Sequence, residues 1–226
     1  MSAADGSRAT ERLDELTRRL RRECPWDREQ DERSIVPHTV SEAYELADAA
    51  HSGDDAKLLD ELGDVLFQVH FLALLLEERG AGDLAAVADH CAEKLIRRHP
   101  HVFADTDVEG ADDVVRNWDE IKRTREGRGA AGLFGDLPEN LPSLSLAAKA
   151  QRRASSDAGP APIEQLRDAV SQLEDAAGRE ERFDELGELL FLAVRCARSL
   201  QVDPEIALRQ ATARFRAHAE AGEGEE

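Results

Sequence analysis

Apolar residues in this chain of 226 amino acids recur at intervals of three and four, and no run of β-branched residues alternates with polar ones. The first period is typical of amphipathic helices, whereas strands alternate with a period of two. Aromatic residues make up only 4% of the chain, and the strong helix formers Ala, Leu, Glu and Arg dominate it. The sequence therefore predicts an all-α fold.

Capping residues and helix breakers divide this pattern into separate helices. Asp54 or Asp55 is a suitable N-cap for a long helix that stops before Gly80, and Asp203 with Pro204 is a strong start signal near the end of the chain. We expect helices over residues 9–22, 40–50, 56–79, 84–98, 112–125, 143–154, 163–177, 180–200 and 204–218.

An internal repeat indicates two related helical modules in tandem. Residues 60–67, DELGDVLF, match residues 184–191, DELGELLF, and residues 95–99 resemble residues 214–218. The Gly- and Pro-rich segment 126–142 is typical of a linker. The predicted division is a first module over 1–125, a linker with one helix (143–154) over 126–161, a second module over 162–218 and an acidic disordered tail over 219–226.

Charge and composition exclude several classes of protein. The chain has 29 Lys and Arg against 48 Asp and Glu, a net charge of −19. Such a chain is not expected to bind duplex nucleic acid by neutralising phosphates, or to lie on a membrane through basic residues. Its most apolar window, residues 65–76, is too short to span a bilayer. Three widely spaced cysteines and a polar N-terminal segment predict a reduced, cytoplasmic protein.

Four acidic residues are spaced for metal binding. Glu42 and Glu45 lie three residues apart on one predicted helix, so they share a helix face, and the same holds for Glu61 and Asp64 on the next. If the two helices pack antiparallel, all four carboxylates face one another and repel unless they are protonated or bridged. Oxygen ligands of this kind select Mg²⁺ or Mn²⁺. A solvent-exposed acidic helix face has the same spacing, so the carboxylates alone leave both interpretations open.

Four segments of the chain occur in an order that is known from one enzyme family. CPWDREQ at residues 24–30 is followed by the two carboxylate pairs, by KLIRRHPHVF at residues 94–103, and by Trp118-x-x-Ile121-Lys122. These segments resemble the CPWDxxQ, ExxE…ExxD, KLxRRHPHVF and WxxIK motifs of the MazG family of nucleoside triphosphate pyrophosphohydrolases. The resemblance covers most of residues 11–155, with a weaker second copy over about residues 162–218.

The resemblance implies an all-α homodimer or higher homo-oligomer that cleaves a nucleoside triphosphate to the monophosphate and pyrophosphate. The expected cofactor is Mg²⁺, with Mn²⁺ as a substitute, and one expected use is the removal of non-canonical nucleotides. By position, the metal ligands and catalytic residues are Glu42, Glu45, Glu61 and Asp64. The family commonly has a further Glu where this chain has Ser41, which leaves the role of that position in orienting water open.

A second set of candidates is basic or aromatic. Lys94, Arg97 and Arg98, here called the basic stripe, share one helix face and could hold phosphate oxygens. The same stripe is also explained as a cation cluster that stabilises a helix C-terminus. Trp118 is a candidate for stacking on a base or for the helix core, and Lys122 is a further candidate phosphate contact. Trp26 is expected in the core.

The second module departs from the metal-binding pattern. It keeps Glu185 and Glu188, but Ala169 and Gln172 occupy the positions of the other pair, so we predict that the first module is active and the second is a degenerate copy. The alternative function is a non-catalytic helical dimer that binds nucleotides or a partner. A ferritin-like di-iron bundle is disfavoured, because none of the seven histidines follows a Glu by three residues. A related enzyme, such as a phosphoribosyl-ATP pyrophosphohydrolase or a dimeric dUTP hydrolase, is a further alternative. The sequence does not identify the base or sugar of the substrate.

Overall fold

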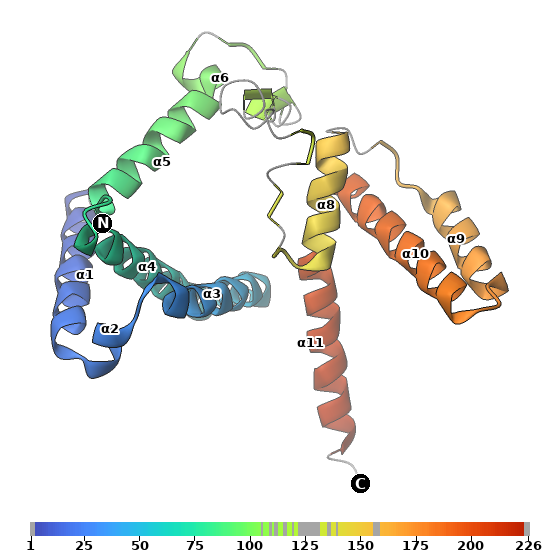
Figure 1. Cartoon of the computed structure of the whole chain (residues 1–226), viewed down its shortest axis with the longest axis horizontal. Helices are drawn as coiled ribbons and strands as arrows, with labels where there is room; N and C mark the ends of the chain where they lie inside the picture. The colour runs from blue at the N-terminus through green and yellow to red at the C-terminus, as the bar shows by residue number, and fades with distance from the viewer. Residues whose placement is uncertain are drawn as a thin grey trace. The chain divides into compact units, whose positions relative to one another are not determined.

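The computed structural model describes residues 3–104, 106–108, 110, 113–114, 117–118, 120–121, 132–134, 137–138, 140–155 and 159–223. Every regular element in these ranges is a helix, which confirms the predicted all-α fold (Figure 1). The chain divides into two compact units, Met1–Arg97 and Arg98–Glu226. None of the helices in the described ranges combines the length and apolarity needed to cross a membrane.

The first unit is built on a pair of long helices. Its helices are α1 (Ala3–Glu23), α2 (Pro25–Glu29), α3 (Glu32–Ser52), α4 (Asp55–Glu78) and α5 (Leu84–Arg98). α3 and α4 pack closely against each other, and α1 packs on α4 and α2. The turn between α3 and α4 depends on Gly53, whose φ of 71° is left-handed. Asp54 then caps α4, as predicted, by accepting hydrogen bonds from the N–H groups of Ala56 and Lys57.

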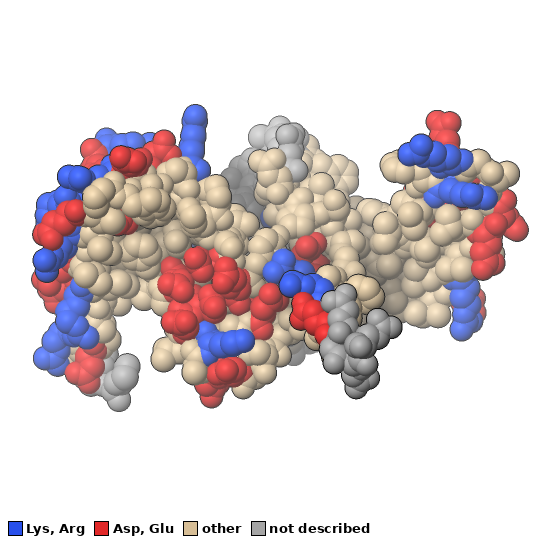
Figure 2. Space-filling model, turned by 90° about the horizontal axis from the view of Figure 1, so that it is seen from below, with Lys and Arg blue, Asp and Glu red and all other residues tan. Residues whose placement is uncertain are grey.

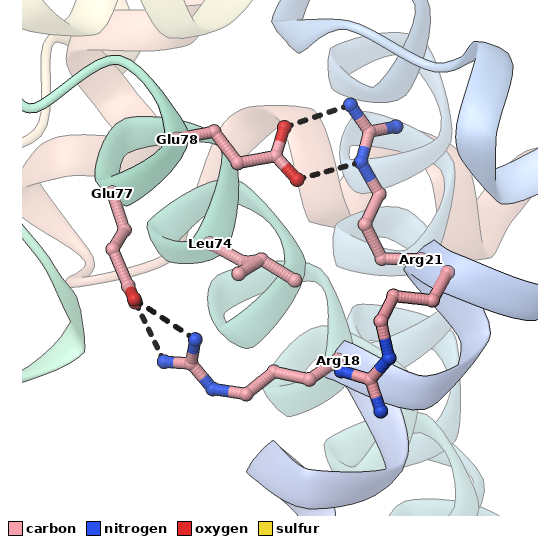
Figure 3. Close-up of a pocket in the computed structure, with 6 residues that line it drawn as sticks. Arg18, Arg21, Leu74, Glu77 and Glu78 are labelled. Carbon is pink, nitrogen blue, oxygen red and sulfur yellow. Dashed lines mark hydrogen bonds and ion pairs between the residues drawn. The ribbon is translucent and has the colours of Figure 1, made fainter.

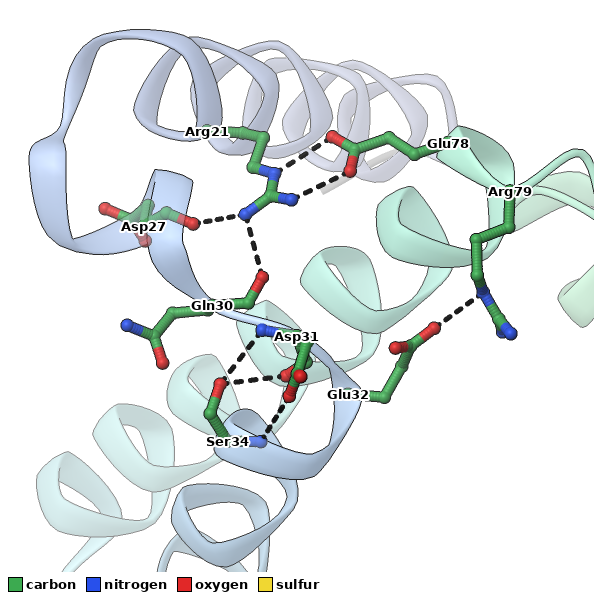
Figure 4. A network of polar contacts seen from close by, with 8 residues as sticks. All are labelled: Arg21, Asp27, Gln30, Asp31, Glu32, Ser34, Glu78 and Arg79. Carbon is green, nitrogen blue, oxygen red and sulfur yellow. Dashed lines mark hydrogen bonds and ion pairs between the residues drawn. The ribbon is translucent and has the colours of Figure 1, made fainter.

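α3 begins at Glu32, well before residue 40, where the sequence analysis placed its start. The reason is a capping box: the Asp31 carboxylate accepts hydrogen bonds from the N–H groups of Arg33 and Ser34, while the Ser34 hydroxyl accepts one from the Asp31 N–H (Figure 4). Pro37 lies inside the helix and removes one hydrogen bond from its second turn. The capped N-terminus at Asp31 therefore extends the helix through Pro37, and the predicted start at residue 40 is wrong.

The core of the first unit lies where α3 and α4 meet. Phe71 is fully buried, with Ile35 and Leu75 beside it, and Phe67 packs against this cluster. Burying such apolar side chains contributes about 1.5–3 kcal/mol each to folding.

Two arginines on α1 tie that helix to the C-terminal end of α4. The guanidinium of Arg18 pairs with Glu77 at 2.6 Å, and that of Arg21 pairs with Glu78 at 2.9 Å (Figure 3). Arg21 also donates hydrogen bonds to the carbonyl oxygens of Asp27 and Gln30 (Figure 4). One partly buried side chain therefore joins α1, α4 and the segment that follows α2. The hydrogen bond from Arg18 lowers the pKa of Glu77, as expected for a carboxylate held in its charged form.

The second unit contains a second helix pair. Its helices are α6 (Pro100–Phe103), α8 (Ser143–Ala154), α9 (Ile163–Asp175), α10 (Arg179–Ser199) and α11 (Pro204–Glu223). α9 packs on α10, and α8 packs on both α10 and α11. The repeated segments 60–67 and 184–191 therefore lie on α4 and α10, the second helix of each pair.

α11 extends to Glu223, so residues 219–223 are helical and the expected disordered tail is wrong over that stretch. The physical reason is that Ala and Glu, both strong helix formers, make up most of it. Of the helix expected over residues 112–125, the described residues between Asp113 and Ile121 are helical, and the remainder lies outside the described ranges.

Candidate metal centre

Three carboxylates converge where α3 packs against α4. One oxygen from each of Glu42, Glu45 and Glu61 lies within 4.8 Å of the others. Glu42 and Glu61 are half-buried and Glu45 is exposed. Figure 2 shows acidic side chains gathered on the face of the molecule formed by this helix pair. The antiparallel packing on which the site depends is therefore present, and it brings together ligand atoms from both helices.

Asp64 lies outside this group of three but acts on it electrostatically. Burial is the main cause that raises the pKa of Glu42 and of Glu61, and the negative charges of Glu45 and Asp64 raise both further. The charge of His38 acts in the opposite direction on the pKa of Glu42. Glu42, Glu45, Glu61 and Asp64, here called the acidic centre, thus repel one another in the metal-free protein. Their oxygen donors and mutual repulsion suit a hard divalent cation, which would relieve that repulsion.

The raised pKa values of Glu42 and Glu61 make metal binding sensitive to pH. We expect Mg²⁺ affinity to fall as the pH is lowered through these values, because protons and the cation compete for the same oxygens. Isothermal titration calorimetry over a pH series measures this effect. Glu61→Gln should show a shallower dependence, since it removes one of the two groups. A Mg²⁺ affinity that does not change across the carboxylate range would contradict the assignment.

Lowering the pH is expected to weaken metal binding but to stabilise the metal-free protein through Glu42 and Glu61. Their folded-state pKa values lie above the unfolded ones, so the folded state binds more protons. Their contribution to the free energy of unfolding therefore rises as the pH falls through that window in the metal-free protein. Urea unfolding of the unmodified chain and of Glu61→Gln, measured over the same pH series, isolates the contribution of Glu61. Other carboxylates, such as Glu77, whose pKa is lowered, contribute equally to both proteins.

Ser41 donates a hydrogen bond of 3.0 Å to Oε1 of Glu45. At the position where the family commonly carries a further Glu, this chain therefore has a neutral donor that orients a member of the acidic centre. The hydroxyl adds neither a negative charge nor an effective proton acceptor. In place of a further carboxylate, this position therefore supplies a contact that orients Glu45.

The other predicted site residues do not join the acidic centre within the first unit. Lys94 and Arg97 lie on α5, a helix with no buried side chain that leads away from the α3–α4 pair (Figure 1). Arg98 and Trp118 belong to the second unit, where the Trp118 ring packs edge-on against His99 at 5.0 Å. Lys122 lies outside the described residues.

Trp26 was expected in the core, but 49% of its surface is exposed. Its ring packs edge-on against His38 at 5.7 Å between centroids. His38 lies four residues before Glu42 on α3, so this aromatic pair stands one helical turn from the acidic centre. The sequence analysis missed this pair, because the contact between Trp26 and His38 depends on tertiary packing; the four-residue spacing of His38 and Glu42 indicated only that His38 shares a helix face with Glu42.

The chain is similar in sequence to known proteins over most of its length. Residues 30–103 match the family model described as the MazG nucleotide pyrophosphohydrolase domain. A Thermotoga maritima protein named nucleoside triphosphate pyrophosphohydrolase/pyrophosphatase MazG is 38% identical over 197 residues, which cover 85% of this chain and 76% of that protein. The Escherichia coli K12 nucleoside triphosphate pyrophosphohydrolase is 36% identical over 203 residues, with 85% and 77% covered. A crystal structure of a mazG-related protein from T. maritima covers 50% of this chain and 99% of its own at 28% identity, with a TM-score of 0.44.

The helix pair and its acidic centre define an all-α protein with a carboxylate site suited to a divalent cation. The matched family segment contains all four residues of that centre. Identity above one third, over most of both sequences, shows that the chain belongs to the MazG family of nucleotide pyrophosphohydrolases.

Proposed function

We propose that this chain hydrolyses a nucleoside triphosphate to the nucleoside monophosphate and pyrophosphate at the acidic centre. The observation that carries the proposal is the convergence of Glu42, Glu45 and Glu61 on one face of the α3–α4 pair, within the family segment. Water attacks the α-phosphorus and pyrophosphate leaves. The proposed cation is Mg²⁺, with Mn²⁺ as a substitute, because both prefer oxygen ligands.

The acidic centre has two tasks in this reaction. Its carboxylates hold the cation, without which they would repel a triphosphate. A cation held there would offset the negative charge of the phosphoryl oxygens and lower the pKa of the attacking water. One carboxylate of the centre accepts the proton of the attacking water. Ser41 orients Glu45 through its hydroxyl.

A homodimer is the proposed assembly, because the first unit exposes many apolar side chains along its long helices. Large apolar residues that are at least 38% exposed on α3, α4 and α5 are Val36, Val40, Leu59, Leu62, Leu66, Val69, Val87, Leu95 and Ile96. Many exposed large apolar side chains on neighbouring helices are typical of a protein interface. Since α5 leads away from its own acidic centre, we propose that the basic stripe binds substrate phosphates at the centre of the second copy.

Arg97→Ala and Arg98→Ala test the basic stripe. A charge-assisted contact is worth about 1.5–3 kcal/mol, so each substitution should lower kcat/KM for a nucleoside triphosphate roughly tenfold to hundredfold. Lys94→Ala and Lys122→Ala should act in the same direction, and Trp118→Leu should raise KM if the ring stacks on the base. Arg12→Ala on the exposed face of α1 is the control. Unchanged kinetics in both arginine variants would contradict the phosphate contact and favour the alternative, a cation cluster that stabilises the helix C-terminus.

Gly63 and Gly187 provide a matched pair, because each follows Asp-Glu-Leu in the repeat and a Cβ at either position meets nothing within 4 Å. Ala is favoured over Gly in a helix interior by about 1 kcal/mol, so both Gly→Ala variants should be more stable by up to that amount. Gly63 lies between Glu61 and Asp64, where we expect substrate to approach the backbone. Gly63→Ala should therefore lower kcat/KM, whereas Gly187→Ala should not. Equal activity in the two variants would show that nothing approaches the helix at Gly63.

The deciding experiment for the function is pyrophosphate release from a panel of canonical and damaged nucleoside and deoxynucleoside triphosphates, with and without Mg²⁺. We expect metal-dependent turnover that a chelator abolishes and added metal restores. Binding of a nucleotide without turnover would instead support the alternative, a non-catalytic binding dimer, which Ser41 and the degenerate second module favour. The panel also identifies the preferred base and sugar.

We further propose that catalysis belongs to the first module alone. The second helix pair carries Glu185 and Glu188 on α10, but Ala169 on α9 is buried and Gln172 is uncharged. Two carboxylates hold a hard cation poorly, and the described residues of this pair contain no acidic group of the kind found on α3 and α4. Glu185→Gln should therefore retain full turnover. A folded but inactive Glu185→Gln variant would show that the second module is needed for catalysis.

A further inference from the structure

A pocket in the second unit contains two arginines and two phenylalanines. Its volume is about 270 Å³, and it is lined by side chains of α8, α10 and the segment before α8. Arg195 and Arg198 lie one turn apart on α10, and the rings of Phe134 and Phe191, which also line it, are about half-exposed. No residue of the acidic centre or of the basic stripe contributes to this arginine pocket.

Neutral oxygens hold the arginines in place. Arg198 donates a hydrogen bond of 3.0 Å to the carbonyl oxygen of Ser155 and a longer one, 3.4 Å, to Oε1 of Gln151. Gln151 is buried and donates in turn to the carbonyl oxygen of Phe191 at 2.8 Å. Arg195 makes a long contact of 3.4 Å to Oε1 of Gln165. These bonds orient the guanidinium groups without neutralising their charge.

Two arginines of a second pocket, between α1 and α4, differ from these in being paired with carboxylates. That pocket is lined by three arginines and two glutamates, and Glu77 and Glu78 pair with Arg18 and Arg21, so most of its positive charge is neutralised (Figure 3). Within the described ranges of the chain, no carboxylate forms an ion pair with Arg195 or Arg198.

The arginine pocket therefore concentrates positive charge in a chain of net charge −19. Burial is the main cause that lowers the pKa of Arg198, and the charges of Arg152 and Arg195 lower it further. An anion placed here would gain from both guanidinium groups and relieve their mutual repulsion.

We propose that the arginine pocket binds a nucleoside phosphate, independently of the acidic centre and without a metal ion. Guanidinium groups match phosphate oxygens through paired N–H donors, which favours Arg195 and Arg198 as the phosphate contacts. A flat base stacks on phenylalanine rings such as Phe134 and Phe191. An inorganic anion would leave the rings without a partner, and a neutral aromatic ligand would leave the cations uncompensated. This site goes beyond the proposed hydrolysis, because it assigns a ligand to the module that lacks the metal-binding pattern.

Calorimetric titration of the full chain with AMP in excess EDTA tests this proposal. EDTA removes the cation that the acidic centre needs, so binding in its presence does not depend on that centre, and loss of binding in Arg195→Gln assigns it to the arginine pocket. We expect one AMP per chain with a Kd below about 1 mM, and at least tenfold weaker binding of adenosine and of inorganic phosphate. Arg195→Gln should weaken AMP binding at least tenfold. Arg214→Gln, an exposed residue of α11 that does not line the pocket, and Glu61→Gln should bind AMP as the unmodified chain does.

Arg195 is preferred to Arg198 as the test, because Arg198 also holds Ser155 and Gln151 and its removal disturbs the packing of α8. Circular dichroism verifies the fold of each variant. Phe191→Leu is a second test variant, which we expect to weaken the binding of AMP but not of phosphate. The proposal is overturned if AMP fails to bind at about 10 mM, if Arg195→Gln binds AMP equally well, or if phosphate or adenosine binds as tightly as AMP. Turnover with Mg²⁺, measured separately, distinguishes a failure of this site from a failure of the hydrolytic one.

Discussion

Glu61→Gln and Asp64→Asn are each expected to abolish Mg²⁺-dependent pyrophosphate release while the protein stays folded. Each substitution removes a negative oxygen from the acidic centre and with it a proposed metal ligand. Loss of residues that merely orient metal ligands already costs roughly tenfold to hundredfold, so loss of a ligand should cost about a hundredfold or more in kcat/KM. Pyrophosphate release at saturating Mg²⁺, followed for each purified variant, measures this loss.

The fold of these variants should be retained or improved, because burial and the charges of Glu45 and Asp64 already raise the pKa of Glu61. Removing a negative charge from such a centre relieves repulsion in the metal-free protein. The melting temperature of Glu61→Gln in EDTA should therefore equal or exceed that of the unmodified chain. Glu185→Gln, the equivalent change in the second module, is the matched control and should retain activity. Full activity in Glu61→Gln would refute the acidic centre as the catalytic site.

Phe71→Ala is expected to destabilise the first unit by about 3–5 kcal/mol, the usual loss when a buried phenylalanine is removed. Phe71 has 0% of its surface exposed and lies in one cluster with Ile35 and Leu75. Its ring is also 5.9 Å from that of Phe67, and the guanidinium of Arg21 lies 5.8 Å from its centre. Urea unfolding followed by far-ultraviolet circular dichroism measures the loss.

Phe183→Ala is the control for this experiment, because Phe183 is 76% exposed on α10. A surface substitution of this kind should change the free energy of unfolding by no more than about 0.5 kcal/mol. Since α3 and α4 also carry the acidic centre, Phe71→Ala should lose activity in parallel with the loss of folded protein. A variant that unfolds at the same urea concentration as the unmodified chain would show that this cluster is not the core of the first unit.

Capping residues and helix breakers in the sequence predicted the ends of several helices closely. The ranges 84–98 and 143–154 agree with the bounds of α5 and α8. Asp54 caps α4 as expected, because a cap forms between residues two or three apart in the chain. The start of α3 at Glu32 was missed, although Asp31 and Ser34, which form its capping box, are a local signal in the sequence.

The helical class, the four-carboxylate motif and the family can be read from the residues alone, because periodicity, capping and motifs are local patterns in the chain. Tertiary packing brings oxygens of Glu42, Glu45 and Glu61 within 4.8 Å of one another and leaves Trp26 exposed. It also decides which arginines meet carboxylates and which, like Arg195, line a pocket with phenylalanines. Burial and charge pairing depend on which distant residues meet when helices pack, and no local pattern specifies that choice.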